Sequence, residues 1–336
     1  MSDSPSKRHR LRNTLIAVGA VVLLIAAPVG VYAFSLSHTF DSKKETIKDP
    51  FPDEASRPAI PEGAAGKAEN ILLLGSDTRG SLDEDLADIR GQRSDTMLVA
   101  HIPADHKHVY VMSIMRDSWV DIPGHGKAKV NAALSYGGIP LVVQTVESLI
   151  SARIDHVAIV DFNGFEGVTN ALGGVDVNND IGFLSSRLAG HYFPQGMQTM
   201  NGTEALAFVG ERYAFADGDF QRVRNQQAYL NAVIKKVLSA GTLLDPVKTN
   251  NLVSAIAPFM KVDKGFDSSY VASLVLRLSS LRSGDISFFT APTAGTGTSD
   301  DGQSIVNLDQ EKMKEVAEAF RTDRLDTYQP EFQTMQ

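Results

Sequence analysis

Acidic and basic side chains occur together wherever three apolar runs of the sequence begin or end. Ligands of open α/β sheets often bind outside the strand ends, so these clusters predict a shared site. The planar donor fork of arginine suits phosphate oxygens, and aspartate is the usual protein ligand of Mg²⁺ that also binds substrate phosphates. The clusters are Asp77 with Arg79 after the run 70–75, Arg93 with Asp95 before the run 96–102, and Arg116 with Asp117 after the run 108–115.

A fourth polar cluster begins at Glu211-Arg212 and continues from Asp217 to Gln227. Arg222 and Gln226 are four residues apart and share one helix face, on which Tyr229 and Val233 follow. Arg224 points away from this row and is expected to be solvated. The acids at 217 and 219 are interpreted as favourable charges near a helix start. A loop leading into this helix could bring Arg222 and Gln226 to the site at the strand ends.

Each cluster alone is more often a set of solvated charges or a surface salt bridge than a site, and a single surface Asp–Arg pair is worth little. Three such clusters beside apolar strands favour a site. Motifs of other chemistries are absent from the sequence: it has no phosphate-binding loop, no H-E-x-x-H and no G-x-S-x-G. It has 0 cysteines, which excludes thiol nucleophiles and Cys-ligated zinc or iron–sulfur centres.

Apolar runs of strand length alternate with amphipathic segments, which predicts an α/β (α+β) single domain with helices packed on a mixed central sheet. The predicted strands are 70–75, 96–102, 108–115, 156–162 and 286–290. The predicted helices are 131–150, interrupted near Gly137-Gly138 and Pro140; 165–172, ended by Gly173-Gly174; 203–212; 220–238; 252–282; and 310–322, capped by Asp309.

Leu15–Phe34 is a run of 20 residues without charge, long enough for one transmembrane helix. Basic residues precede it, so residues 1–14 are expected in the cytoplasm and the rest of the chain outside. The alternative is a cleavable signal peptide ending near Val31-Tyr32-Ala33. We predict a spacer over 35–69, because it is rich in proline and charge, a catalytic domain over 70–325 and a polar tail over 326–336.

The net charge of −8 is unevenly distributed. Residues 1–14 carry a net charge of +3 and residues 15–34 carry none, so residues 35–336 carry a net charge of −11. Such an acidic remainder argues against a protein that binds nucleic acid through bulk positive charge, and no nucleic-acid partner is expected.

The ordered motifs resemble the LytR-CpsA-Psr family of membrane-anchored cell-envelope phosphotransferases. The resemblance covers about residues 70–240. It rests on ILLLGSDTR at 71–79, RSDTMLV at 93–99, VMSIMRDSWVDIPG at 111–124, KVNAALSYGG at 129–138, IDHVAIVDFNGFEGVTNALGGVDV at 154–177 and GMQTMNGTEALAFVGERYAFADGDFQRVRNQQ at 196–227.

The resemblance implies an enzyme that moves a glycan phosphate from a polyprenyl-pyrophosphate carrier, held in an apolar pocket, to a peptidoglycan hydroxyl. Its implied partners are this lipid-linked donor, the peptidoglycan acceptor and membrane lipid. It implies a Mg²⁺ cofactor at Asp77 and Asp95. It also implies pyrophosphate contacts from Arg93, Arg116, Arg212, Arg222 and Gln226. Asp117 follows Arg116, and we expect it to orient the acceptor hydroxyl.

Two positions depart from the family pattern. The family usually has Arg-x-Arg where this chain has Gly210-Glu211-Arg212, and often a second arginine where Asn225 stands. One pyrophosphate contact could therefore be missing or replaced from elsewhere. Two alternatives to the transferase stay open: a binder of lipid-linked glycan without catalysis, which Gly210 favours, and a hydrolase that uses water at the same site.

Overall fold

The computed structural model describes residues 36–76, 94–239 and 245–328. The predicted membrane segment Leu15–Phe34 and the predicted site residues Asp77 and Arg93 lie outside these ranges. Asp95 lies within a described strand, of which only the backbone is described at that position.

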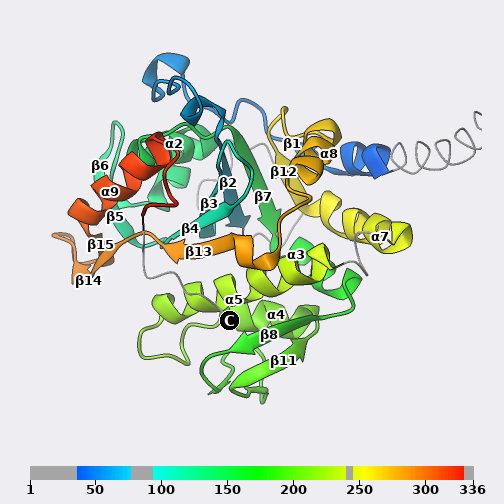
Figure 1. Cartoon of the computed structure of the whole chain (residues 1–336). Helices are drawn as coiled ribbons and strands as arrows, with labels where there is room; N and C mark the ends of the chain where they lie inside the picture. Colours follow the sequence, from blue (N-terminus) through cyan, green and yellow to red (C-terminus); the bar gives the residue numbers. More distant parts are fainter. Residues whose placement is uncertain (1–35, 77–93, 240–244, 329–336) are drawn as a thin grey trace, which may run out of the picture.

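A seven-stranded mixed sheet forms the centre of the molecule (Figure 1). β2 runs parallel to β7 and antiparallel to β3, and β3 runs antiparallel to β4. The strands, in spatial order, are β1 (Glu45–Thr46), β12 (Met260–Val262), β7 (His156–Asp161), β2 (Glu69–Ser76), β3 (Ser94–Ile102), β4 (Val109–Ile114) and β13 (Ile286–Thr290).

Successive side chains of a strand point to opposite faces of the sheet, and both faces are covered. Leu72 is 0% exposed and belongs to a core with α2 (Ala132–Ile150) and α9 (Gln310–Arg321). Its neighbour Ile71 packs on the other face, in a core that includes side chains of α5 (Asp219–Leu238), α7 (Pro246–Ile256) and α8 (Ser268–Arg277). The molecule therefore has three layers, in which the sheet lies between two layers of helices. This is the α/β arrangement that the sequence predicts.

Below the ends of β2 and β7, α3 (Phe162–Ala171), α4 (Gly202–Gly210) and α5 pack with a short hairpin (Figure 1). Two two-stranded ladders and a second, four-stranded sheet complete the described strands. They are β8 (Val175–Asn179) with β11 (Gly196–Met200), β9 (Phe183–Leu184) with β10 (Tyr192–Phe193), and the sheet β14 (Thr293–Thr298), β15 (Ser304–Leu308), β5 (Ser118–Ile122) and β6 (Gly126–Lys129). The 3₁₀ turns are η1 (Glu54–Ser56), η2 (Ala65–Lys67), η4 (Ala257–Phe259) and η5 (Ser283–Asp285).

Helix ends follow the predicted local signals. The carboxylate of Asp309 accepts from the backbone N–H of Lys312 and caps α9. α3 ends at Ala171 before Gly173 and Gly174, whose φ angles are 71° and 91°. In α2 the backbone at Gly137 and Gly138 is not helical, which confirms the interruption expected there.

Two expectations differ from the structure. The single helix expected over 252–282 is wrong, because β12 separates α7 from α8 and adds an antiparallel strand beside β7. The segment expected as a solvated spacer is partly packed: β1 pairs with β12, and Ile47 is 2% exposed. β12 pairs with β7, and β1 pairs with β12. Both segments therefore form strands through partners that are distant in the sequence, which their local composition did not reveal.

Within the described ranges, α2 is the one helix that is long and apolar enough to cross a membrane. Ten of its residues are buried, among them Val142, Val143 and Val146 at 0% exposure, so α2 is a core helix of the domain.

Candidate active site

The strand order places the end of β2, the start of β3 and the end of β4 at one edge of the sheet. Ser76, at the end of β2, pairs with Ser94 at the start of β3. β4 runs antiparallel to β3 and therefore ends at the same edge, two residues before Arg116. Asp77 follows Ser76 in the chain and Asp95 follows Ser94, and a site that contains both residues stays a prediction. Ligands of such sheets bind at this kind of edge.

The carboxylate of Asp219 joins three arginines that are distant in the sequence. Its Oδ2 lies 3.1 Å from Nη2 of Arg222 and 3.4 Å from Nε of Arg116, and its Oδ1 lies 3.5 Å from Nε of Arg212. Asp219 is the first residue of α5, and the preceding Gly218 has φ 49°, a conformation that favours glycine. The turn at Gly218 thus aims the carboxylate at the arginines.

Asp117 forms the second acidic position of this cluster. Its Oδ1 lies 3.0 Å from Nζ of Lys129, the last residue of β6, and its Oδ2 lies 3.5 Å from Nε of Arg116. Burial by itself would raise the pKa of Asp117, but the bond from Lys129 and the nearby cations outweigh it and lower the pKa below its usual value. Asp117 is therefore an ionised hydrogen-bond acceptor and a weak base at neutral pH.

We refer to these side chains together as the arginine cluster. It consists of Arg116, Arg212, Arg222, Lys129, Asp117 and Asp219. Its four cations face two carboxylates, so it has an excess of two positive charges within a chain of net charge −8. A local excess of this kind, partly shielded from water, attracts an anion far more strongly than the average charge of the chain suggests.

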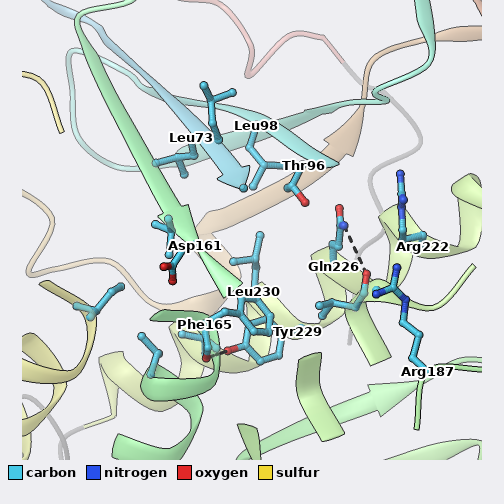
Figure 2. A pocket seen from close by; sticks show the side chains of 18 residues that line it. Leu73, Thr96, Leu98, Asp161, Phe165, Arg187, Arg222, Gln226, Tyr229 and Leu230 are labelled. Carbon is cyan, nitrogen blue, oxygen red and sulfur yellow. Dashed lines mark hydrogen bonds between the residues drawn. The ribbon is translucent and has the colours of Figure 1, made fainter. Parts of the chain in front are cut away.

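An apolar cavity of about 210 Å³ lies on one side of the arginine cluster, between the sheet and the helices. Arg222 and Gln226 line one part of it, and Tyr229 and Val233 continue the lining along α5, as the helical spacing predicts. In Figure 2, Arg187, Arg222 and Gln226 lie together on one side of the cavity, away from Phe165. The remaining lining comes from β2, β3, β7, α3, α4 and α7 and is mainly aliphatic: Leu73, Leu74, Leu98, Val160, Val168, Val209, Leu230 and Ile256.

A second cavity, of about 510 Å³, is bordered by other members of the cluster. We call it the polar cavity, because Asp117, Arg212 and Asp219 line it together with hydroxyl groups of the second sheet at Thr296 and Ser304. The arginine cluster therefore stands between an apolar and a polar cavity.

Among the predicted site residues, the structure brings Arg116, Asp117, Arg212 and Arg222 into one cluster. Gln226 lies one helical turn further along α5, with its Nε2 3.5 Å from the carbonyl oxygen of Val209. Within the described residues, no group of three or more His, Asp or Glu side chains forms a metal site, and the predicted ligands Asp77 and Asp95 have no described side chains.

The sequence alone did not identify Asp219 or Arg187 as site residues. Asp219 was interpreted as a charge near a helix start, although its spacing of three residues from Arg222 allowed the ion pair that the structure shows. Arg187 lies in the loop between β9 and β10, outside all four clusters, and no sequence signal marks it. Arg224 bonds to Asp217 and Gln221, apart from the cluster.

The family model described as the LytR_cpsA_psr family matches residues 31–322. The chain belongs to the LytR_cpsA_psr family. The match extends from the predicted membrane segment through α9 and contains every residue of the arginine cluster.

Curated relatives and solved structures agree with this membership. The protein named polyisoprenyl-teichoic acid–peptidoglycan teichoic acid transferase TagU of Enterococcus faecalis is 29% identical, over 91% of this chain and 95% of its own length. The cell wall biosynthesis protein LcpA of Corynebacterium glutamicum is 28% identical over 92% of this chain, which spans only 65% of LcpA. The structure of TagT bound to LI-WTA is 27% identical with a TM-score of 0.62, and the match covers 81% of this chain and 98% of TagT.

The structure explains one of the two departures from the family pattern. Asn225 is 2% exposed, donates to the carbonyl oxygen of Phe208 at 3.1 Å and accepts from Gln221 at 3.0 Å. It therefore ties α5 to the end of α4 and faces the helix contact. Gly210 lines the apolar cavity beside Arg187.

Proposed function

We propose that this LytR_cpsA_psr family protein is a phosphotransferase that moves a glycan phosphate from a polyprenyl-pyrophosphate carrier to a peptidoglycan hydroxyl. The observation that carries the proposal is the position of the arginine cluster between an apolar and a polar cavity. A lipid-linked pyrophosphate has an apolar chain, a dianionic centre and a polar glycan in the same order.

The donor would place its polyprenyl chain among the aliphatic side chains of the apolar cavity and its pyrophosphate at the arginine cluster. Arg116, Arg212 and Arg222 can donate to phosphate oxygens through several N–H groups each. Removal from water strengthens these contacts, and Arg222 is 3% exposed. In phosphoryl transfer, positioning and electrostatic stabilisation provide most of the catalysis, so this cluster needs no covalent nucleophile.

The acceptor would enter through the polar cavity, where the Asp117 carboxylate can accept a hydrogen bond from its hydroxyl group. The acceptor oxygen forms a bond to the glycan-side phosphorus, and the bond from that phosphorus to the bridging oxygen breaks. Polyprenyl phosphate leaves with the bonding electron pair, and the acceptor proton passes to Asp117 or to solvent. The lowered pKa of Asp117 suits orientation of the hydroxyl better than early removal of its proton.

Mg²⁺ fits the proposed site through the oxygen ligands that it prefers. The pairing of Ser76 with Ser94 puts the chain positions before Asp77 and Asp95 side by side, so the two residues are the proposed ligands. When bound, the ion would neutralise part of the pyrophosphate charge. The uncharged segment Leu15–Phe34 would hold the catalytic domain on the outer side of the membrane that contains the donor.

The test uses the full chain in detergent with a polyprenyl-pyrophosphate-linked glycan, peptidoglycan and Mg²⁺. The native protein is expected to release polyprenyl phosphate and to form a glycan–peptidoglycan phosphodiester. Arg116→Ala is expected to lower the rate about 100- to 1000-fold, as loss of a transition-state donor does. Arg321→Ala is the matched control, because Arg321 pairs only with Glu318 on the exposed face of α9 among the described residues.

Other products would overturn the proposal in distinct ways. Release of free glycan phosphate without the phosphodiester would identify a hydrolase. Tight donor binding without release of polyprenyl phosphate would identify a binder. Native rates in Arg116→Ala would remove the arginine cluster from the mechanism.

A further inference from the structure

Gly210 provides the space in which the guanidinium of Arg187 lies. A Cβ atom at position 210 would be 2.9 Å from both Cζ and Nε of Arg187 and 3.0 Å from its Nη1. Carbon atoms in contact are normally about 3.5–4 Å apart, so any larger residue would have to displace this guanidinium. The glycine in the last position of α4 and the arginine in the β9–β10 loop therefore form one structural unit.

Glu211 fixes the loop that carries Arg187. Its carboxylate is buried and accepts from the backbone N–H and the hydroxyl of Ser186, both at 2.7 Å, and from the hydroxyl of Ser185 at 3.2 Å. The hydroxyl of Ser185 in turn accepts from the backbone N–H of Arg187 at 3.1 Å. The same carboxylate accepts from the backbone N–H of Arg212 at 2.9 Å. One buried anion thus holds the segments of two arginines in a fixed relation.

The guanidinium of Arg187 has no ion pair with a carboxylate anywhere in the described part of the chain, although it lies beside an apolar cavity. Figure 2 shows it beside Arg222 and Gln226. Arg187 is exposed and Arg222 is buried, and both line the same cavity, so an anion bound beside them would offset the repulsion between their like charges. The arrangement therefore indicates an anionic ligand at the entrance of the apolar cavity.

The arginines line different cavities, and we relate each cavity to one phosphate of a bound pyrophosphate. Arg187 and Arg222 line the apolar cavity, whereas Arg212 lines the polar one. We propose that Arg187, held over Gly210 by the Glu211-bound loop, binds the lipid-side phosphate of the donor, which leaves as polyprenyl phosphate. This inference rests on the proposed function. It also assigns to Arg187 the phosphate contact that an arginine at position 210 would otherwise make.

The experiment titrates the detergent-solubilised full chain with geranylgeranyl monophosphate and geranylgeranyl pyrophosphate by calorimetry. Arg187→Ala is expected to weaken binding of both lipids at least about tenfold, as loss of a charged hydrogen bond does. Arg212→Ala is expected to weaken only the pyrophosphate and to leave the monophosphate within about twofold. The double variant Arg187→Ala with Gly210→Arg returns a guanidinium to the same place and should recover most of the lost affinity. Arg321→Ala is the control.

Each other result overturns a defined part of the inference. Equal binding of both lipids by native protein and Arg187→Ala shows that Arg187 contacts no phosphate. A loss confined to the pyrophosphate removes the lipid-side assignment. A loss that Gly210→Arg does not reverse, together with a lower unfolding temperature, shows that Arg187 only supports its loop. A native chain that binds neither lipid contradicts the proposed function itself.

Discussion

At the scale of single residues, Asp219 is the anion that three arginines of the cluster share. Its carboxylate holds Arg116, Arg212 and Arg222 at 3.1–3.5 Å, and two of these three separations are longer than a good charged hydrogen bond. The arginines are thus oriented by Asp219 without being saturated by it. Such an arrangement limits the repulsion between the guanidinium groups.

A substitution of Asp219 can distinguish the orientation of the guanidinium groups from their attraction for the anionic donor. Asp219→Asn removes one negative charge from the cluster, so the donor should bind at least as tightly as before. Turnover should fall about 10- to 100-fold, because the guanidinium groups are no longer held in the geometry of the transition state. Steady-state kinetics with the lipid-linked donor measure kcat and KM separately. Asp326→Asn, at an exposed ion pair with Arg324, is the control; a proportional rise of KM in Asp219→Asn would refute the positioning role.

At the scale of elements, the strands and helices that carry the site were predictable because their signals are local. Residues 71–74 are an uninterrupted apolar run within β2, and the spacing of Arg222 and Gln226 placed both on one face of α5. The small second sheet was not predicted, since Gly295 and Gly297 in β14 resemble a loop and their strand forms only through pairing with β15. Contacts between distant segments, such as Arg187 with Gly210, have no periodicity and need the structure.

The β9–β10 loop offers a prediction about pH at the same scale. Burial alone would raise the pKa of Glu211, but the hydrogen bonds from Ser186, Ser185 and the backbone of Arg212 lower it below its usual value. A carboxyl group whose pKa is lower in the folded state contributes stability above its unfolded pKa of about 4.3 and loses it as the pH falls through the folded value.

Glu211→Gln should therefore unfold more easily than the native chain at pH 7, by about 1–3 kcal/mol, because several donors lose their ionised acceptor. The difference should begin to shrink when the pH falls below about 4.3, where the unfolded carboxyl group takes up a proton, and should be lost as the pH falls through the lower pKa of the folded state. Urea unfolding at pH 7 and near pH 3.5, followed by circular dichroism, measures both values. Glu318→Gln on the exposed face of α9 serves as the comparison, and a difference independent of pH would contradict the assigned role of the charge.

At the scale of the whole molecule, the fold separates two environments that the reaction needs together. The sheet and the helices α3, α4, α5 and α7 enclose the apolar cavity, while the second sheet contributes the polar one, and the arginine cluster lies where they meet. The net charge of −8 argues against a surface that binds polyanions in bulk, whereas the arginine cluster at this junction has a local excess of positive charge. The architecture therefore selects a ligand that is apolar at one end, anionic in the middle and polar at the other end.

The apolar cavity extends along helix α5. Arg222, Gln226, Tyr229 and Val233 line it on successive turns, so Val233 lies about 16 Å along the helix from Arg222 at a rise of ~1.5 Å per residue. A bulky side chain at position 233 should shorten the cavity without touching the phosphate contacts. Val233→Trp is expected to weaken binding of geranylgeranyl pyrophosphate about tenfold and binding of geranyl pyrophosphate less than twofold.

A bulky residue in a packed site destabilises a protein by about 1–3 kcal/mol by itself. The two lipids of different length serve as the control for this effect. General damage from overpacking would weaken both lipids equally, whereas a shortened cavity discriminates by chain length. Val247→Trp makes the same substitution at a residue of α7 that is 67% exposed, and it should change neither affinity. Equal affinities of Val233→Trp and the native protein for both lipids would place the polyprenyl chain outside the cavity between the sheet and α5, and would require a different path from the membrane to the arginine cluster.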